Sequence, residues 1–192
     1  MKKLLLSLVL LFAVTGFSYG DPMGITVDTT VGSYLTATSS LMWYRDTGVT
    51  YTKLPMNLGV RVSHKVYDGF ALTGSQDNYR ITGQVYMALD KIVSGVSFRP
   101  FAGAALNNST SVTNSISVNG GFDSSLKMLS FAGFTPVVGG EVLFFTDAKQ
   151  AEYYGGFEYT VMPGLKAAAL YSAIYTSGAH KIGFGAKVSY AF

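Results

Sequence analysis

The chain has 192 residues, of which 48% are hydrophobic and only 13% are charged, about half the usual charged fraction of about 25%. It holds 22 glycines, 14% aromatic residues and no cysteine, and its formal net charge is +3. This composition excludes a disordered or collagen-like chain. The lack of cysteine excludes disulfides, thiolate metal sites and cysteine nucleophiles.

Residues 1–20 have the pattern of a secretory signal peptide. Two lysines precede an apolar stretch from Leu4 to Phe17, and the segment ends in small residues before a polar one. The apolar stretch is too short for a membrane anchor, so we expect cleavage after residue 20 and a mature domain over 21–192. Removing the two lysines lowers the net charge to about +1, so the basic balance gives no reason to expect a nucleic-acid partner.

The mature chain alternates polar and apolar residues with a period of two, which is typical of β-strands. In the last twelve residues the apolar side chains share one face: Ile182, Phe184, Ala186, Val188, Tyr190 and Phe192. Strands of about 10–13 residues, tilted by about 40°, cross an apolar band about 25 Å tall. One face is rich in Gly, Ser, Thr and Asn and suits a hydrated lumen, and the other suits lipid. The expected interfacial aromatic girdles are formed by Tyr51, Tyr67, Phe70, Tyr79, Tyr159, Tyr175, Tyr190 and Phe192.

The chain ends in Val188, Tyr190 and Phe192, an aromatic last residue with apolar residues two and four positions before it. With the alternation before it, this segment resembles the C-terminal assembly signal of the small bacterial outer-membrane β-barrels, the class of outer-membrane proteins A, X and W. The resemblance implies an all-β, antiparallel, up-and-down transmembrane barrel in the bacterial outer membrane. It also implies two partners, the lipid of that membrane and the machinery that inserts barrels into it.

We expect ten strands, because five segments are expected to run outward and antiparallel closure then needs five inward strands; the resulting even number places both termini in the periplasm. The pattern F-x-P-x-x-G at 98–103 and again at 134–139 resembles strand starts on the periplasmic side, and 67–69 and 162–164 have the composition of short periplasmic turns. The expected strands are 24–37, 53–66, 69–76, 79–90, 95–106, 112–126, 132–145, 151–161, 165–177 and 181–192. The alternative is eight strands, with one pair absorbed into a long loop around 107–130.

The one long outer connection, 38–52, contains an aromatic cluster at Met42, Trp43, Tyr44 and Arg45. An exposed aromatic cluster on a loop can be a recognition patch for an extracellular ligand or partner. The alternative is a loop that folds over the barrel rim.

The alternation points a set of charged side chains into the lumen: Asp28, Arg61, Lys65, Arg80, Arg99, Asp123, Glu141, Glu158, Lys166 and Lys187. Strand neighbourhood predicts three groupings, Arg99 with Asp123, Glu158 with Lys166, and Asp28 with both Lys187 and Arg61. Such ion pairs would rigidify a narrow barrel. The alternative is a polar path for small solutes.

No catalytic, cofactor or metal site is predicted. The two histidines, His64 and His180, are expected at opposite rims, and the adjacent Ser63 and His64 point to opposite faces, so neither zinc binding nor a Ser-His dyad is expected. Three functions remain in competition. They are a structural or surface-interaction barrel, a minor channel for small solutes, and a soluble periplasmic β-barrel that binds an apolar ligand.

Overall fold

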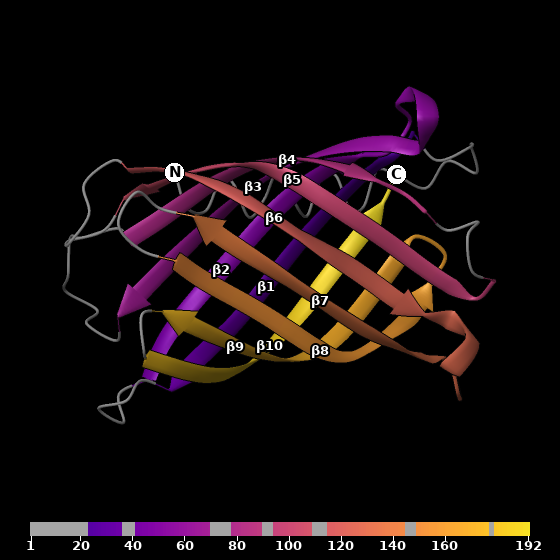
Figure 1. Ribbon diagram of the computed structural model, residues 1–192. Coiled ribbons are helices and arrows are strands. Elements are labelled where there is room, and N and C mark those ends of the chain that lie inside the picture. Colours follow the sequence, from indigo (N-terminus) through magenta and orange to yellow (C-terminus); the bar gives the residue numbers. More distant parts are fainter. Residues whose placement is uncertain are drawn as a thin grey trace, which may run out of the picture.

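A computed structural model of the protein describes residues 23–35, 41–69, 78–89, 94–108, 115–144, 149–176 and 179–192. These residues form a closed antiparallel barrel in which each strand pairs with its sequence neighbours and the last strand closes on the first (Figure 1). The ten strands are β1 Ile25–Leu35, β2 Leu41–Tyr51, β3 Leu58–Gly69, β4 Asn78–Met87, β5 Val96–Asn108, β6 Ser115–Leu126, β7 Phe134–Phe144, β8 Lys149–Met162, β9 Leu165–Thr176 and β10 Ala179–Ala191. The expected up-and-down barrel of ten strands is confirmed, and the count of eight is wrong. Within the described ranges, no helix has the length and apolar character needed to cross a membrane.

Two expected boundaries near the N-terminus are wrong. The segment expected to be an outer loop over 38–52 contains β2, and the strand expected over 69–76 does not begin at Gly69, which ends β3. The rest of that expected strand lies outside the described residues. The alternation in β2 is hidden because its inward positions include Met42 and Tyr44, whereas its outward positions include Arg45 and Thr47.

This correction reverses the expected direction of β3. The turn before it contains the short 3-10 helix η1, Pro55–Asn57, with Met56 and Asn57 at positive φ. It lies at the barrel end that holds Met23 and Phe192, which we call the terminal end; the other end is the loop end. Residues 67–69 therefore belong to the loop end and are not a turn at the terminal end, whereas Pro163 and Gly164 do form one. The second 3-10 helix, η2 Lys127–Leu129, also lies at the terminal end.

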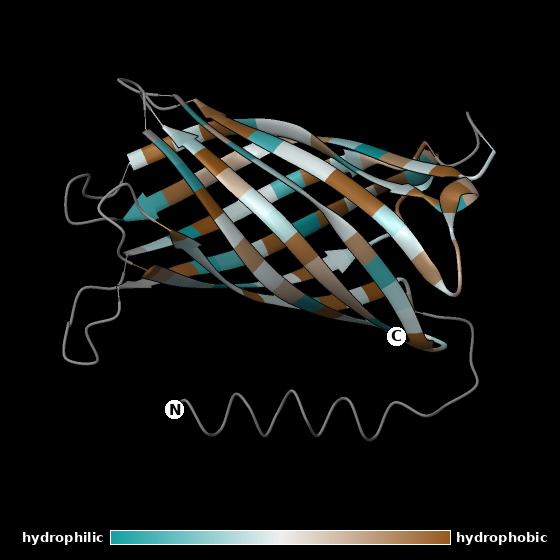
Figure 2. Ribbon diagram, turned by 90° about the horizontal axis from the view of Figure 1, so that it is seen from below, coloured by the Kyte–Doolittle hydropathy of each residue, from teal (hydrophilic) through white to brown (hydrophobic). Residues whose placement is uncertain are grey.

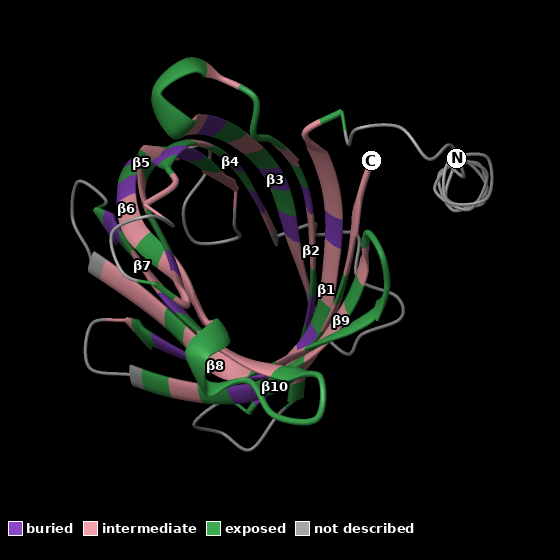
Figure 3. Cartoon of the chain, turned by 90° about the vertical axis from the view of Figure 1, so that its right-hand side faces the viewer, coloured by how far each residue is buried: buried purple, intermediate pink, exposed green. Residues whose placement is uncertain are grey.

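The outward face of the barrel is apolar and the inward face is polar, as the alternation predicts. Hydrophobic and hydrophilic residues follow one another along the strands in Figure 2. Outward Phe184 and Ile116 are 70% and 71% exposed, whereas inward Tyr34 is 2% exposed. Figure 3 looks along the barrel from the terminal end and shows buried positions on every side of the ring.

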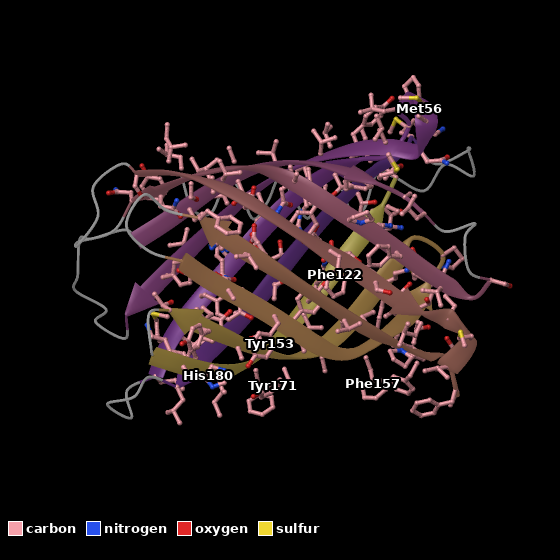
Figure 4. All side chains as sticks on the ribbon, viewed as in Figure 1. Met56, Phe122, Tyr153, Phe157, Tyr171 and His180 are labelled. Carbon is pink, nitrogen blue, oxygen red and sulfur yellow. The ribbon has the colours of Figure 1, made fainter. Side chains whose placement is uncertain are left out.

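Aromatic side chains line much of the outer wall. Phe157 and Tyr171 point away from the barrel in Figure 4, and Tyr153 lies beside His180, with 2.6 Å between its Oη and the His180 Nε2. Of the expected girdle residues, Tyr51, Tyr159 and Tyr175 are exposed on the outer wall. Tyr67 was misplaced, since it points inward, and Phe70 lies outside the described residues.

Glycines on the inner wall make room for tyrosine rings on the neighbouring strand. Tyr44 lies across from Gly32, Tyr86 across from Gly59, and Tyr154 across from Gly139. A Cβ atom at any of these three glycines would overlap the ring of its partner. The high glycine content thus has a packing reason, because a flat ring can lie on the backbone only where no side chain stands below it.

Candidate functional site

The lumen is crossed by an ion pair between opposite strands. Glu152 Oε2 on β8 accepts a 2.6 Å hydrogen bond from Lys65 Nζ on β3, and these strands lie five positions apart in the ring of ten. The two side chains are 13% and 6% exposed. The two side chains start from opposite walls of the barrel and meet within the lumen.

Glu152 gathers three further donors at its second carboxylate oxygen. Oε1 accepts hydrogen bonds of 2.9 Å from Arg80 Nη1, 2.7 Å from Gln150 Nε2 and 3.2 Å from Tyr67 Oη. Charge-assisted bonds of this kind are stronger than neutral ones. The carboxylate therefore contacts both Lys65 and Arg80 and ties β3, β4 and β8 across the lumen.

Arg80 links this carboxylate to a second one on β7. Its Nη2 lies 3.4 Å from Glu141 Oε2, and Glu141 Oε1 accepts hydrogen bonds from Asn119 Nδ2 and, at 3.1 Å, from Gln84 Nε2. We call Lys65, Arg80, Glu141 and Glu152 the crossbar. Its charges balance, with two cations and two carboxylates in mutual contact.

Tyrosine rings surround the cationic end of the crossbar. Tyr34 and Tyr44 stack with their centroids 4.7 Å apart, and they form a buried cluster with Ile174 of β9. The Lys65 Nζ lies 5.6, 4.9 and 5.2 Å from the ring centroids of Tyr34, Tyr44 and Tyr67. These distances allow cation–π attraction, so the rings both fill the bore and hold the ammonium group.

Three smaller contacts were expected from strand neighbourhood, and two of them form. Asp28 Oδ1 lies 2.8 Å from Arg61 Nη2 and 3.6 Å from Lys187 Nζ. Glu158 Oε1 accepts a 2.7 Å bond from Lys166 Nζ, whose side chain is 46% exposed.

The third expected contact does not form. Arg99 and Asp123 lie directly opposite in the register of β5 and β6, yet they are not joined by an ion pair within the described ranges. Asp123 Oδ1 instead accepts a 2.6 Å hydrogen bond from Tyr154 Oη. The Tyr154 ring lies on Gly139 of β7 and so reaches from β8 to Asp123 on β6, two strands away along the inner wall.

The lumen also contains a cavity of about 260 Å³. Its lining combines crossbar residues with Arg61, Arg99, Asp123, Lys166 and Lys187. A cavity with such a lining suits water and small polar solutes better than an apolar ligand. Within the described ranges, no group of three or more His, Asp or Glu side chains is arranged to hold a metal ion.

The structure separates the residues expected to form a loop patch. Met42, Trp43, Tyr44 and Arg45 lie in β2 and not in a loop, which corrects the expectation. Met42 and Tyr44 pack in the lumen near the Tyr34 ring, whereas Trp43 and Arg45 are exposed on the outer wall. Alternation in a strand sends neighbouring residues to opposite faces, so these four cannot act as one surface.

Sequence reasoning missed the residue at the centre of the crossbar. Glu152 has the same parity as Glu158 in the expected strand over 151–161, so the alternation that pointed Glu158 inward was a signal that could have placed Glu152 in the lumen. The expected place of His64 near the periplasmic rim was also wrong, whereas His180 lies at the loop end, where the last outer connection was expected. His64 lies in the half of β3 toward the loop end and His180 lies at the loop end of β10, so they share one half of the barrel.

The C-terminal residues are tied into the closure of the barrel. Val188 is exposed on the outer wall, and the Tyr190 and Phe192 rings lie edge to face with centroids 4.7 Å apart. Phe192 donates its backbone N–H to Ile25 at 2.8 Å. The role of these three residues as an assembly signal stays a prediction.

None of the protein-family models matches the sequence, and no curated protein does. Among solved structures, the chain is similar to the β domain of the Bordetella autotransporter BrkA, with 11% identity over 90% of this chain and 100% of that one and a TM-score of 0.49. It is similar to the KdgM porin in complex with oligogalacturonate, with 11% identity over 87% and 99% and a TM-score of 0.47. It is also similar to Neisserial surface protein A, with 16% identity over 88% and 96% and a TM-score of 0.40. These likenesses concern the fold alone, and the fold is the one that the resemblance to small outer-membrane barrels implied.

Proposed function

We propose that the chain is an integral barrel of the bacterial outer membrane with a structural or surface-interaction role, and that its lumen is closed by the crossbar. The apolar outer wall supports the membrane location. A soluble barrel needs a charged exterior, whereas exposed Val62, Ile116 and Phe184 are typical of the wall. In this orientation the terminal end faces the periplasm and the loop end faces outside.

The single observation that carries a closed lumen is the contact between Lys65 and Glu152 on opposite strands. Arg80 and the stacked rings of Tyr34 and Tyr44 occupy the space beside it. A resting channel needs a continuous hydrated path, and this arrangement interrupts such a path. The same charged lumen argues against the soluble barrel with an apolar ligand.

The arrangement of the chain's serine and histidine side chains supports a role without catalysis. Ser63 is buried on the inner wall, whereas His64 is exposed on the outer wall and packs edge to face on Tyr79 at 5.8 Å between centroids. A serine nucleophile needs a histidine within hydrogen-bond reach, and these neighbours cannot supply one.

Conductance in planar bilayers tests the closed lumen. The chain is folded in detergent, checked by its change of gel mobility on boiling in SDS, and inserted at known density. We expect no stable conductance steps for the unmodified chain and none for Glu158→Ala, which removes only an exposed ion pair. Regular conductance steps from the unmodified chain would overturn the closed lumen and favour a channel.

A gated channel for small solutes is the second candidate, because the contacts of Lys65 and Arg80 with β8 depend on one carboxylate, which lines a polar cavity. In Glu152→Ala, the cations of β3 and β4 lose their partner on β8. Steps that occur in Glu152→Ala alone would identify the crossbar as the barrier and favour a gate. If the Glu152→Ala barrel shows no conductance steps but still changes its gel mobility on boiling, the gate is excluded and the structural role is favoured.

A further inference from the structure

One cation stands apart from the others. Of the acidic residues, lysines and arginines whose side chains are described within the strands, Arg45 alone points outward, and it is exposed. Its neighbours in the register are Val31 on β1 and Val66 on β3. Among the described residues it makes no ion pair. An arginine on the lipid-facing side of a barrel lowers stability to an extent that depends on its depth, so its position needs a compensating partner.

Polar and aromatic residues gather around Arg45 on the same face. Thr47, the next outward residue of β2, pairs in register with His64, which makes Arg45 and His64 diagonal neighbours, and the His64 ring contacts Tyr79. Trp43 is the next outward residue toward the loop end. We call Trp43, Arg45, Thr47, His64 and Tyr79 the Arg45 patch. It interrupts a wall that is otherwise apolar at Val60, Val62, Ile81 and Val85.

We propose that the Arg45 patch binds the phosphate group of an anionic lipid in the outer leaflet. The proposal rests on the membrane location proposed above. A guanidinium group matches phosphate with two parallel hydrogen bonds, and His64 offers a second donor in diagonal position. The patch carries positive charge with no acid among its members, which complements a lipid phosphate.

The depth of Arg45 fits a headgroup contact. It lies four residues from the loop end of β2, or about 10 Å along the membrane normal at about 3.3 Å per residue and about 40° of tilt. The flexible arginine stem can extend toward the surface and bring the guanidinium to the phosphates. Trp43, an amphipathic ring of the kind enriched at membrane interfaces, stands between Arg45 and the loop end.

Native mass spectrometry of the detergent-folded barrel tests the proposal. The two probes are lipid A with both phosphates and the same lipid A with its phosphates removed, each titrated in the same detergent. The variants are Arg45→Gln and, as the matched control, Arg99→Gln, which neutralises an inward arginine that also lacks an ion pair among the described residues. We expect the unmodified chain and Arg99→Gln to bind the phosphorylated lipid at least about tenfold more tightly than the stripped one. Arg45→Gln is expected to lose that preference.

Equal binding of the two lipids by the unmodified chain would overturn the proposal. An equal loss of the preference for phosphorylated lipid in Arg45→Gln and Arg99→Gln would also overturn it. Asp68 occupies the register position opposite Trp43, and Asp68→Asn should keep or strengthen the preference. A loss of preference in Asp68→Asn would contradict a simple phosphate contact. The gel-mobility shift on boiling is read on the same samples, so failure of the proposed membrane barrel is distinguished from failure of lipid recognition by a correctly folded one.

Discussion

Neutralising Glu152, the crossbar carboxylate that contacts both cations, should destabilise the barrel more than neutralising an exposed carboxylate in its lumen. Glu152→Gln keeps the size of the side chain but removes the charge that faces Lys65 and Arg80. After the change Arg80 still has Glu141 at 3.4 Å, whereas Lys65 keeps the Tyr34 hydroxyl at 3.5 Å and the ring faces around it but no carboxylate contact among the described residues. Leaving a buried ion without its partner costs about 3–5 kcal/mol, and most of that cost falls on Lys65.

The exposed pair in the same barrel provides the reference. Glu158→Gln breaks the contact with Lys166, whose side chain is 46% exposed, and should lower the free energy of unfolding by at most about 1 kcal/mol. Urea unfolding in lipid vesicles, followed by the fluorescence of the single tryptophan, Trp43, gives the free energy of unfolding for each variant. The expected difference between the two variants is therefore about 2–5 kcal/mol.

A second substitution distinguishes the cost of an unpaired Lys65 charge from that of a general packing defect. Lys65→Met in the Glu152→Gln background removes the cation that has lost its partner and should recover at least half of the lost free energy. Equal losses for Glu152→Gln and Glu158→Gln would refute the reasoning. So would a Lys65→Met rescue of zero, because it would show that Lys65 is solvated and not held by the carboxylate.

Three further predictions follow from the walls of the barrel. Gly139→Ala should displace the Tyr154 ring and lower the free energy of unfolding by about 1–3 kcal/mol, whereas Gly83→Ala, where a Cβ atom meets nothing within 4 Å, should leave it unchanged or raise it slightly. A double-mutant cycle between Tyr154→Phe and Asp123→Asn should give a coupling energy of about 1.5–3 kcal/mol, and additive losses would contradict the 2.6 Å hydrogen bond. Trp43 should be quenched by lipids brominated in the upper acyl chain and protected from aqueous iodide, and the reverse pattern would contradict its place on the outer wall.

The strands that could be predicted are those whose two faces differ in polarity. The expected strand 181–192 differs by one or two residues from β10 because outward apolar and inward polar or small residues alternate there without a break. In β2 the rule fails, since an arginine and a threonine stand outward while a methionine and a tyrosine stand inward. Arg45, the outward arginine that obscured the alternation of β2, is also the residue on which lipid recognition is proposed. The break in the pattern therefore coincides with a proposed functional position.

Most of the predicted lumen contacts that form join adjacent strands; the exception is Asp28 with Arg61, whose strands β1 and β3 are separated by β2. Asp28 with Lys187 and Glu158 with Lys166 follow from the pairing of neighbours, which strand order alone supplies. The crossbar depends on the width of the bore and on which strands stand opposite, and both follow from closure of the whole ring. Alternation placed Glu141 in the lumen, but nothing local in the sequence pairs it with Arg80.

The lumen of this barrel takes the place of a hydrophobic core, and its composition determines how it can open. Tyr34, Tyr44 and Ile174 fill part of the bore with packed side chains. These side chains stay in place when a lumen charge is neutralised. The crossbar spans another part of the lumen with long charged side chains, which we expect to separate and hydrate once one partner is lost. Glu152 therefore contributes to the stability of the barrel and also to the proposed closure of its lumen. If Glu152→Ala lowers stability by several kcal/mol and also conducts, the crossbar is the seal. If stability falls while the bilayer stays silent, the aromatic cluster closes the bore and the crossbar serves to brace the wall.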